Sequence, residues 1–282
     1  MKGNKMFDNI CVLGTGALAK SCCRILSEKG REVILYDTNE EPSWYLKRQC
    51  EKIEGTGYRF FDRKGTFADI AALKGKILII SATNPYIIPA VITDNPEVTA
   101  INLHHALLPA HPGRNAEAWT IYEEDEYGGI TWHFVTSTVD GGDIICRKSI
   151  KLSDDITSWK LLKLQNDLAI EAFSGFADEL MAGKLKGTKQ EQSNSRLHYS
   201  YEKPGDGVLD PDLPAKRISA FLRSMDYGPV KCMGDPRMII DGKEKVITGY
   251  TINKEEKDAE GDMIITGDGI TISLKLADGN GE

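Results

Sequence analysis

Short apolar runs alternate with amphipathic segments through the first half of the chain. The run at 76–81 contains four consecutive apolar residues, 77–80, which is typical of a strand buried on both faces of a parallel sheet. Apolar runs predict strands at 9–14, 32–36, 58–61, 76–81 and 98–103. Helices are expected up to about residue 29 and at 42–53, 66–73 and 115–122. Regular alternation of strand and helix predicts an α/β fold with a mostly parallel, doubly wound, Rossmann-like sheet.

The hydrophobic pattern changes in the second half of the chain. Strand-like runs at 130–135 and 143–146 precede a long amphipathic segment, 157–181, that predicts a helix with one apolar face. A polar stretch rich in Gln, Ser, Asn, Lys and Gly follows. After a further helix at 213–225, short strands are expected at 238–240, 246–250, 263–265 and 270–274. We therefore expect a first domain at 1–186, a linker at 187–210 and a small C-terminal β domain, an OB-like barrel, at 211–282.

Composition narrows the class of protein. The 282 residues carry a formal net charge of −7, which disfavours a large polyanionic partner and gives no reason to expect DNA binding. None of the apolar runs approaches the roughly 18 residues of a membrane span. The six cysteines form no Cys-x-x-Cys pair and no Cys/His cluster, so we expect reduced thiols, a cytoplasmic protein and no metal site.

The first strand runs into a glycine-containing turn with two interpretations. Gly14-Thr15-Gly16 followed by Ala19, with Asp37 at the end of the second strand, fits the pattern of NAD(P)-binding Rossmann oxidoreductases. Alternatively, the glycines allow a strand to pack closely on the next helix, and Asp37 is an ordinary turn residue. The pattern alone does not separate these hypotheses.

A second group of residues indicates acyl-transfer chemistry. Asn102 and His104 lie at the end of the strand expected at 98–103, and Asp140 follows another strand-like run. An amide can donate to an oxyanion, an imidazole can move a proton, and a carboxylate can orient the imidazole. Because ligands of doubly wound sheets bind beyond the carboxyl ends of the strands, we expect these three groups to share one site.

These residues also carry a resemblance. Asn102-Leu103-His104, Leu107-Leu108-Pro109 and Asp140-Gly141-Gly142 together resemble the folate-dependent formyltransferase family, which includes methionyl-tRNA and glycinamide ribonucleotide formyltransferases. The resemblance implies N10-formyltetrahydrofolate as donor, an amine as acceptor, and Asn102, His104 and Asp140 as the catalytic trio. It also makes the first domain the catalytic one and favours the packing explanation of Gly14 and Gly16.

The resemblance assigns roles around the trio. Asn102 is expected to donate to the oxyanion, with a protonated His104 beside it and Asp140 favouring the charged imidazole. The folate is expected along Tyr86, Ile87 and Ile88, in a pocket closed by Leu107, Leu108, Pro109, Thr136 and Val139. For each apolar member, ordinary core packing is the competing explanation. Ala106 stands where a serine is common in the family, and His133 matches a family histidine or simply occupies a strand face.

The acceptor amine is the open question. A methionyl-tRNA enzyme should carry basic clusters, because phosphate contacts dominate RNA affinity, whereas this chain is acidic overall. The segment 225–237 resembles formyltransferase modules that act on carrier-bound amino acids. We expect a small-molecule or carrier-bound amine first, an amino sugar next and Met-tRNA last. A folate-binding or folate-hydrolysing protein without an acceptor is a further alternative.

Overall fold

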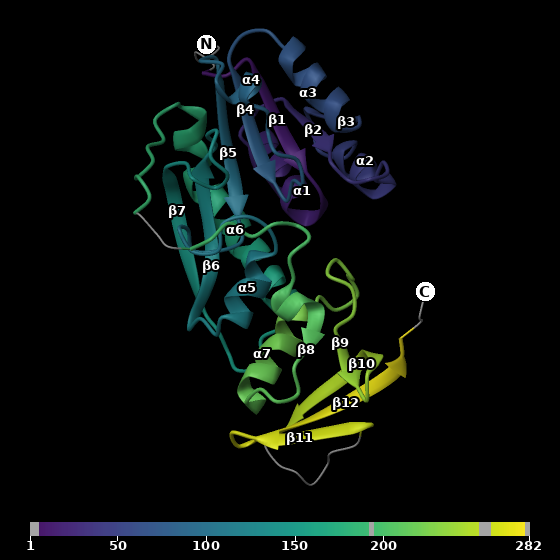
Figure 1. The fold of residues 1–282 in the computed structure, drawn as a ribbon. Coiled ribbons are helices and arrows are strands. Elements are labelled where there is room, and N and C mark those ends of the chain that lie inside the picture. The colour runs from purple at the N-terminus through teal and green to yellow at the C-terminus, as the bar shows by residue number, and fades with distance from the viewer. Residues whose placement is uncertain (1–5, 192–194, 254–260, 280–282) are drawn as a thin grey trace. The chain divides into compact units, whose positions relative to one another are not determined.

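The computed structural model describes residues 6–191, 195–253 and 261–279. The chain forms two compact units, each assembled from three separate segments (Figure 1). The first unit comprises Met1–Pro112, Gly129–Ser149 and Leu164–Arg196. The second comprises Gly113–Gly128, Ile150–Lys163 and Leu197–Glu282. Among the described residues, no helix combines the length and apolar character required to cross a membrane.

A seven-stranded sheet organises the first unit, in the order β3-β2-β1-β4-β5-β6-β7. Strands β1 to β5 pair in parallel, and β6 runs antiparallel to β5, so the predicted mostly parallel α/β fold is confirmed. All six residues of β4 are buried, as the apolar run predicts. The strands are β1 (Asn9–Gly14), β2 (Val33–Asp37), β3 (Thr56–Phe60), β4 (Ile77–Ala82), β5 (Val98–His104), β6 (Tyr127–Phe134) and β7 (Ile144–Lys151).

Local capping determines where the helices begin. The Ser43 hydroxyl accepts from the Leu46 N–H at 3.2 Å, so α2 begins after Ser43 rather than at Pro42. The Asp62 carboxylate likewise accepts from the Gly65 N–H at 2.7 Å, and α3 therefore begins three residues earlier than predicted. The helices are α1 (Gly16–Glu28), α2 (Trp44–Cys50), α3 (Arg63–Ala72), α4 (Ala90–Thr93), α5 (Ala116–Tyr122), α6 (Ser158–Met181) and α7 (Ala215–Met225).

An aromatic cluster fastens α6 to the sheet within the first unit. Trp132 on β6 packs against Phe173 and Phe176, with ring centroids 5.4 and 5.8 Å apart. The Trp132 indole also donates to the Ala169 carbonyl at 3.1 Å. Burial of these large rings, each contributing roughly 1.5–3 kcal/mol, fixes the part of α6 that lies behind the candidate site.

The second unit contains the expected small β domain. Its five-stranded sheet has the order β11-β12-β10-β9-β8, and α7 supplies Ile218, Phe221 and Leu222 to the core beside it. The strands are β8 (Val208–Leu209), β9 (Arg237–Ile240), β10 (Lys243–Asn253), β11 (Met263–Gly267) and β12 (Ile270–Asp278). The end of the stretch expected as linker is ordered here as a 3-10 turn, Pro204–Gly207, followed by β8.

Candidate active site

Strand register places an amide beside an imidazole. Asn102 on β5 lies opposite His133 on β6, and Asn102 Nδ2 is 3.1 Å from His133 Nε2. His133 Nδ1 lies 2.8 Å from the Phe134 carbonyl oxygen, which can only accept, so Nδ1 is the donor of this contact. Nε2 is then an acceptor for the Asn102 amide. His133 therefore fixes the direction of the amide that the sequence assigned to the oxyanion.

His104 is held in the opposite tautomer. It ends β5 and is 5% exposed, and its Nε2 donates to the His111 carbonyl oxygen at 2.8 Å. The other nitrogen, Nδ1, faces Asp140 Oδ2 at 3.5 Å. This distance is longer than a good hydrogen bond, so the imidazole and carboxylate are adjacent without being tightly joined.

Asp140 reaches the two histidines from a strained turn. Its φ of 50° is in the left-handed region, which Asp tolerates better than most residues. Its Oδ1 lies 3.4 Å from His133 Nε2 and 3.5 Å from Asn102 Nδ2. Gly142 allows the turn to close, because a Cβ there would lie 1.7 Å from the Phe134 carbonyl oxygen. The structure thus brings the predicted trio together, with His133 as a fourth member.

Burial sets the protonation of His104. Desolvation lowers the pKa of His104 below its ordinary value of 6.5, and the Asp140 carboxylate, which acts in the opposite sense, does not offset it. A neutral resting imidazole beside a carboxylate differs from the protonated His104 expected from sequence. The reason is that burial of the ring outweighs attraction by one carboxylate. This pair can accept a proton during a reaction.

Two side-chain amides hold the loops of the site. Gln165 on α6 is fully buried and donates to the carbonyl oxygens of His105 at 2.7 Å and Gly129 at 2.8 Å. Gln190 donates to the carbonyl oxygens of Asp140 at 2.6 Å and Gly142 at 2.8 Å. Gln190 fell within the stretch interpreted as linker. Gln165 could have been identified from the sequence, because it is a polar residue on the inner face of an amphipathic helix.

The loop after His104 is tied down from β6. The Thr131 hydroxyl accepts from the Leu108 N–H at 3.0 Å and donates to the Ala106 carbonyl at 2.7 Å. The peptide bond between Leu108 and Pro109 is cis. The Ala106 side chain is buried, so a serine at this position would also point into the protein interior.

The residues expected to contact the folate differ in how exposed their side chains are. Ile87 is 63% exposed and Val139 is 40% exposed, so both present apolar surface to solvent. Thr136 is also exposed, whereas Tyr86, Leu107 and Pro109 are half-buried. Ile88 and Leu108 lie in the core, as core packing predicts.

The glycine turn at the first strand has a packing explanation. A Cβ at Gly14 would lie 1.8 Å from the Ala82 carbonyl oxygen, so β1 needs glycine here to approach β4. The buried Asp37 carboxylate accepts from the Asn39 and Ser43 N–H groups at 3.0 and 2.8 Å. It also accepts from the Asn39 amide at 2.6 Å and the Tyr58 hydroxyl at 2.7 Å. These four donors occupy the carboxylate that a dinucleotide ribose would need.

Comparisons with known proteins find similarity to formyltransferases. A family model described as formyl transferase matches residues 67–174, a range that includes Asn102, His104 and Asp140. A methionyl-tRNA formyltransferase of Desulfotalea psychrophila is 27% identical over 59% of this chain and 51% of its own length. A GDP-perosamine N-formyltransferase of Brucella melitensis is 29% identical over 59% of this chain and 62% of its own. The chain thus spans between half and two thirds of these curated relatives.

Solved structures share the fold over nearly the whole chain. An N-formyltransferase from Helicobacter canadensis, in complex with folinic acid and dTDP-3-aminofucose, has a TM-score of 0.71 at 15% identity, covering 95% of this chain and 99% of its own. WlaRD, a sugar 3N-formyltransferase, has a TM-score of 0.72 at 17% identity, covering 97% and 98% of the two chains.

Proposed function

Because this chain belongs to the folate-dependent formyltransferase family, we propose that it transfers the formyl group of N10-formyltetrahydrofolate to an amine. One observation carries the proposal: Asn102, His104 and Asp140 converge from two distant segments, with Asn102 Nδ2 3.5 Å from Asp140 Oδ1 and His104 Nδ1 3.5 Å from Asp140 Oδ2. Each group has a function in acyl transfer to nitrogen.

The roles follow from the protonation states. The acceptor nitrogen forms a bond to the formyl carbon, and the carbonyl oxygen becomes an oxyanion that the Asn102 amide stabilises. The amine loses its proton to the His104 imidazole, whose lowered pKa favours the neutral form before the reaction. The imidazolium that results faces the Asp140 carboxylate. The bond from the formyl carbon to N10 breaks, and the same proton is delivered to N10. The products are a formamide and tetrahydrofolate.

The donor is expected beside Tyr86 and Ile87, with Leu107, Pro109, Thr136 and Val139 around it. The exposed apolar faces of Ile87 and Val139 support this assignment, because a ring system would remove them from water. Ile88 and Leu108 support these segments from the core.

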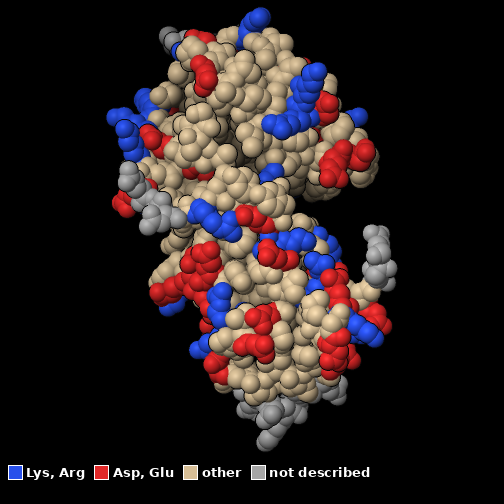
Figure 2. Space-filling model, in the orientation of Figure 1, with Lys and Arg blue, Asp and Glu red and all other residues tan. Residues whose placement is uncertain are grey.

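For the acceptor, we favour an amino group on a small molecule, and a nucleotide-linked amino sugar within that class. Near-complete coverage of both chains in the structural comparisons with sugar N-formyltransferases supports this choice. On the face seen in Figure 2, Lys and Arg are interspersed with Asp and Glu rather than gathered into a basic tract, which disfavours tRNA. Met-tRNA is the second candidate because the curated relatives include methionyl-tRNA formyltransferases.

The acceptor is tested by direct assay. The full chain is incubated with N10-formyltetrahydrofolate and either a nucleotide-linked amino sugar, a free amino acid, Met-tRNA or no amine, and released tetrahydrofolate and formylated product are measured. We expect product from the amino sugar. Product from Met-tRNA alone would replace our choice of acceptor, and formate release without any amine would indicate a hydrolase.

The catalytic trio is tested in the same assay. Asn102→Ala, His104→Ala and Asp140→Ala should each lower turnover by at least about 100-fold, because each removes a group that acts in the transition state. The exposed Asp94 provides a matched control, and Asp94→Ala should retain full turnover. Near-native turnover in all three variants would show that these residues are not the catalytic groups.

A further inference from the structure

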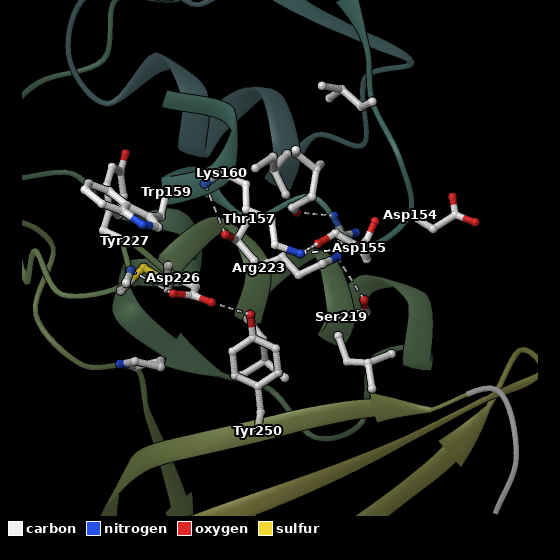
Figure 3. A pocket seen from close by; sticks show the side chains of 18 of the residues that line it. Asp154, Asp155, Thr157, Trp159, Lys160, Ser219, Arg223, Asp226, Tyr227 and Tyr250 are labelled. Atoms are coloured by element: carbon white, nitrogen blue, oxygen red, sulfur yellow. Dashed lines mark hydrogen bonds and ion pairs between the residues drawn. The ribbon is translucent and has the colours of Figure 1, made fainter. Parts of the chain in front are cut away.

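A cavity lies entirely within the second unit. It encloses about 1160 Å³ and is lined by the beginning of α6, by α7, by the loop before β9 and by β10 (Figure 3). The lining combines apolar side chains with charged ones. This volume is slightly above the roughly 300–1,000 Å³ of typical small-molecule sites in proteins. The proposed formyl transfer does not use it.

Arg223 is the unusual group in this cavity. Its Nε donates to the Ser219 hydroxyl at 3.1 Å (Figure 3). Its Nη1 donates to the Ile156 carbonyl at 3.0 Å. Both acceptors are neutral, and no carboxylate within the described residues lies close enough to form an ion pair with Arg223. A guanidinium has five N–H donors, so three are left for a ligand.

Burial makes this arrangement costly. Desolvation lowers the pKa of Arg223, and the nearby carboxylates of Asp154 and Glu124 act in the opposite sense without offsetting it. A half-buried cation without a counterion is unfavourable unless an anion binds to it. An anionic ligand would supply the missing partner.

Neighbouring charges limit which anion fits. Lys160 is paired with Asp155 at 3.0 Å, and the Asp226 carboxylate accepts from the Tyr250 hydroxyl at 2.9 Å (Figure 3). The lining carries seven Asp and Glu side chains and five Lys and Arg side chains, so it is acidic on balance and disfavours a phosphate or another multiply charged anion. A single carboxylate matches the one guanidinium of the lining, that of Arg223. The Trp159 indole lines the same cavity and can cover an apolar body.

We propose that this cavity binds a small organic acid with one carboxylate and an apolar body, the carboxylate on Arg223 and the body against Trp159. The guanidinium fork suits a bidentate carboxylate. The site is distinct from the trio and does not depend on the proposed transfer reaction.

The test uses 3-phenylpropionate and its neutral amide as probes on the full chain. Nitrogen-15 labelled indole resonances report binding, with Trp159 in the cavity and Trp44, in the first unit, as an internal reference. We expect 3-phenylpropionate to shift the Trp159 resonance in a saturable manner and leave that of Trp44 unchanged. The amide and inorganic phosphate should leave both unchanged.

Two arginines on α7 provide matched variants. Arg223→Gln should weaken binding of 3-phenylpropionate at least about tenfold, since it removes a charged hydrogen-bond donor. Arg217→Gln should have no effect, because Arg217 pairs with Glu124 and does not line the cavity. If Arg223→Gln does not fold, Arg223→Lys keeps the charge without the fork and should still weaken binding. Equal binding of the amide, saturable binding of phosphate, or loss of binding in Arg217→Gln would overturn the proposal.

Discussion

Among individual residues, the chemistry of the candidate site depends on which nitrogen of each imidazole carries the proton. His133 donates through Nδ1 and His104 through Nε2, each to a backbone carbonyl that can only accept. The remaining lone pairs therefore face Asn102 in one case and Asp140 in the other. The backbone carbonyl oxygens thus determine which nitrogen of each imidazole donates and which nitrogen faces the other site residues.

The lowered pKa of His104 predicts how stability depends on pH. In the unfolded chain the imidazole binds a proton near its ordinary pKa of 6.5, whereas in the folded protein it does so only at lower pH. The unfolded state therefore binds more protons, and the free energy of unfolding should fall as the pH falls from 6.5 towards the lowered value. Denaturant titrations between pH 7.5 and 5.5 should show a smaller decline in His104→Gln than in the wild type, and equal declines would contradict the assignment.

Among the structural elements, the candidate site depends on polar contacts from outside the strands that carry its residues. Gln165 reaches the loop after β5 from α6, and Gln190 reaches the turn at Asp140 from beyond that helix. Gln165 joins the loop after β5 to Gly129 on β6, and Gln190 holds the turn at Asp140 at two carbonyl oxygens. Precise placement of catalytic groups depends on such support.

Gln190 should act as a positioning residue. In Gln190→Ala the Asp140 turn loses both donors, and we expect kcat to fall roughly tenfold with a much smaller change in KM, since a small misplacement mainly affects the transition state. The adjacent Glu191 is exposed, and Glu191→Ala provides the control. A change in KM alone would argue that Gln190 contacts substrate instead.

Two glycines give opposite predictions for the same substitution. Gly142→Ala places a Cβ 1.7 Å from the Phe134 carbonyl, and should lower the free energy of unfolding by roughly 2 kcal/mol or more. Gly175→Ala lies on an open face of α6 and should raise it by about 0.5–1 kcal/mol. Denaturant unfolding of both variants checks the pair. Equal effects would mean that the turn at Gly142 is not sterically restricted.

Across the whole molecule, the sequence predicted the features that depend on local pattern. The strand predicted at 76–81 is β4, Ile77–Ala82, with all six residues buried. Asn102 and Asp140 were expected to meet because strand ends share one edge of a sheet. The antiparallel register that brings His133 opposite Asn102 was not predictable, since register depends on tertiary pairing. The lowered pKa of His104 likewise required knowledge of its burial.

The turn at Gly14 shows that a sequence pattern alone does not establish a binding function. Gly14 and Asp37 fit a dinucleotide pattern, but the pattern does not say what surrounds the carboxylate. Since Asp37 accepts four donors from its own surroundings, titration with NADH should give no saturable change in cofactor fluorescence. Asp37→Asn should instead lower the melting temperature, because an amide cannot accept at both positions. Saturable NADH binding would restore the oxidoreductase hypothesis.

Because each unit is built from three separate segments, cutting the chain at one point does not separate the two units. A fragment that ends near Arg196 contains every segment of the first unit. It also retains two segments of the second unit, Gly113–Gly128 and Ile150–Lys163. Ala118 on the first of these segments packs into the same apolar cluster as Phe221 and Leu222 of α7. Deleting the C-terminal third would expose that surface to water, and such a fragment should aggregate when expressed.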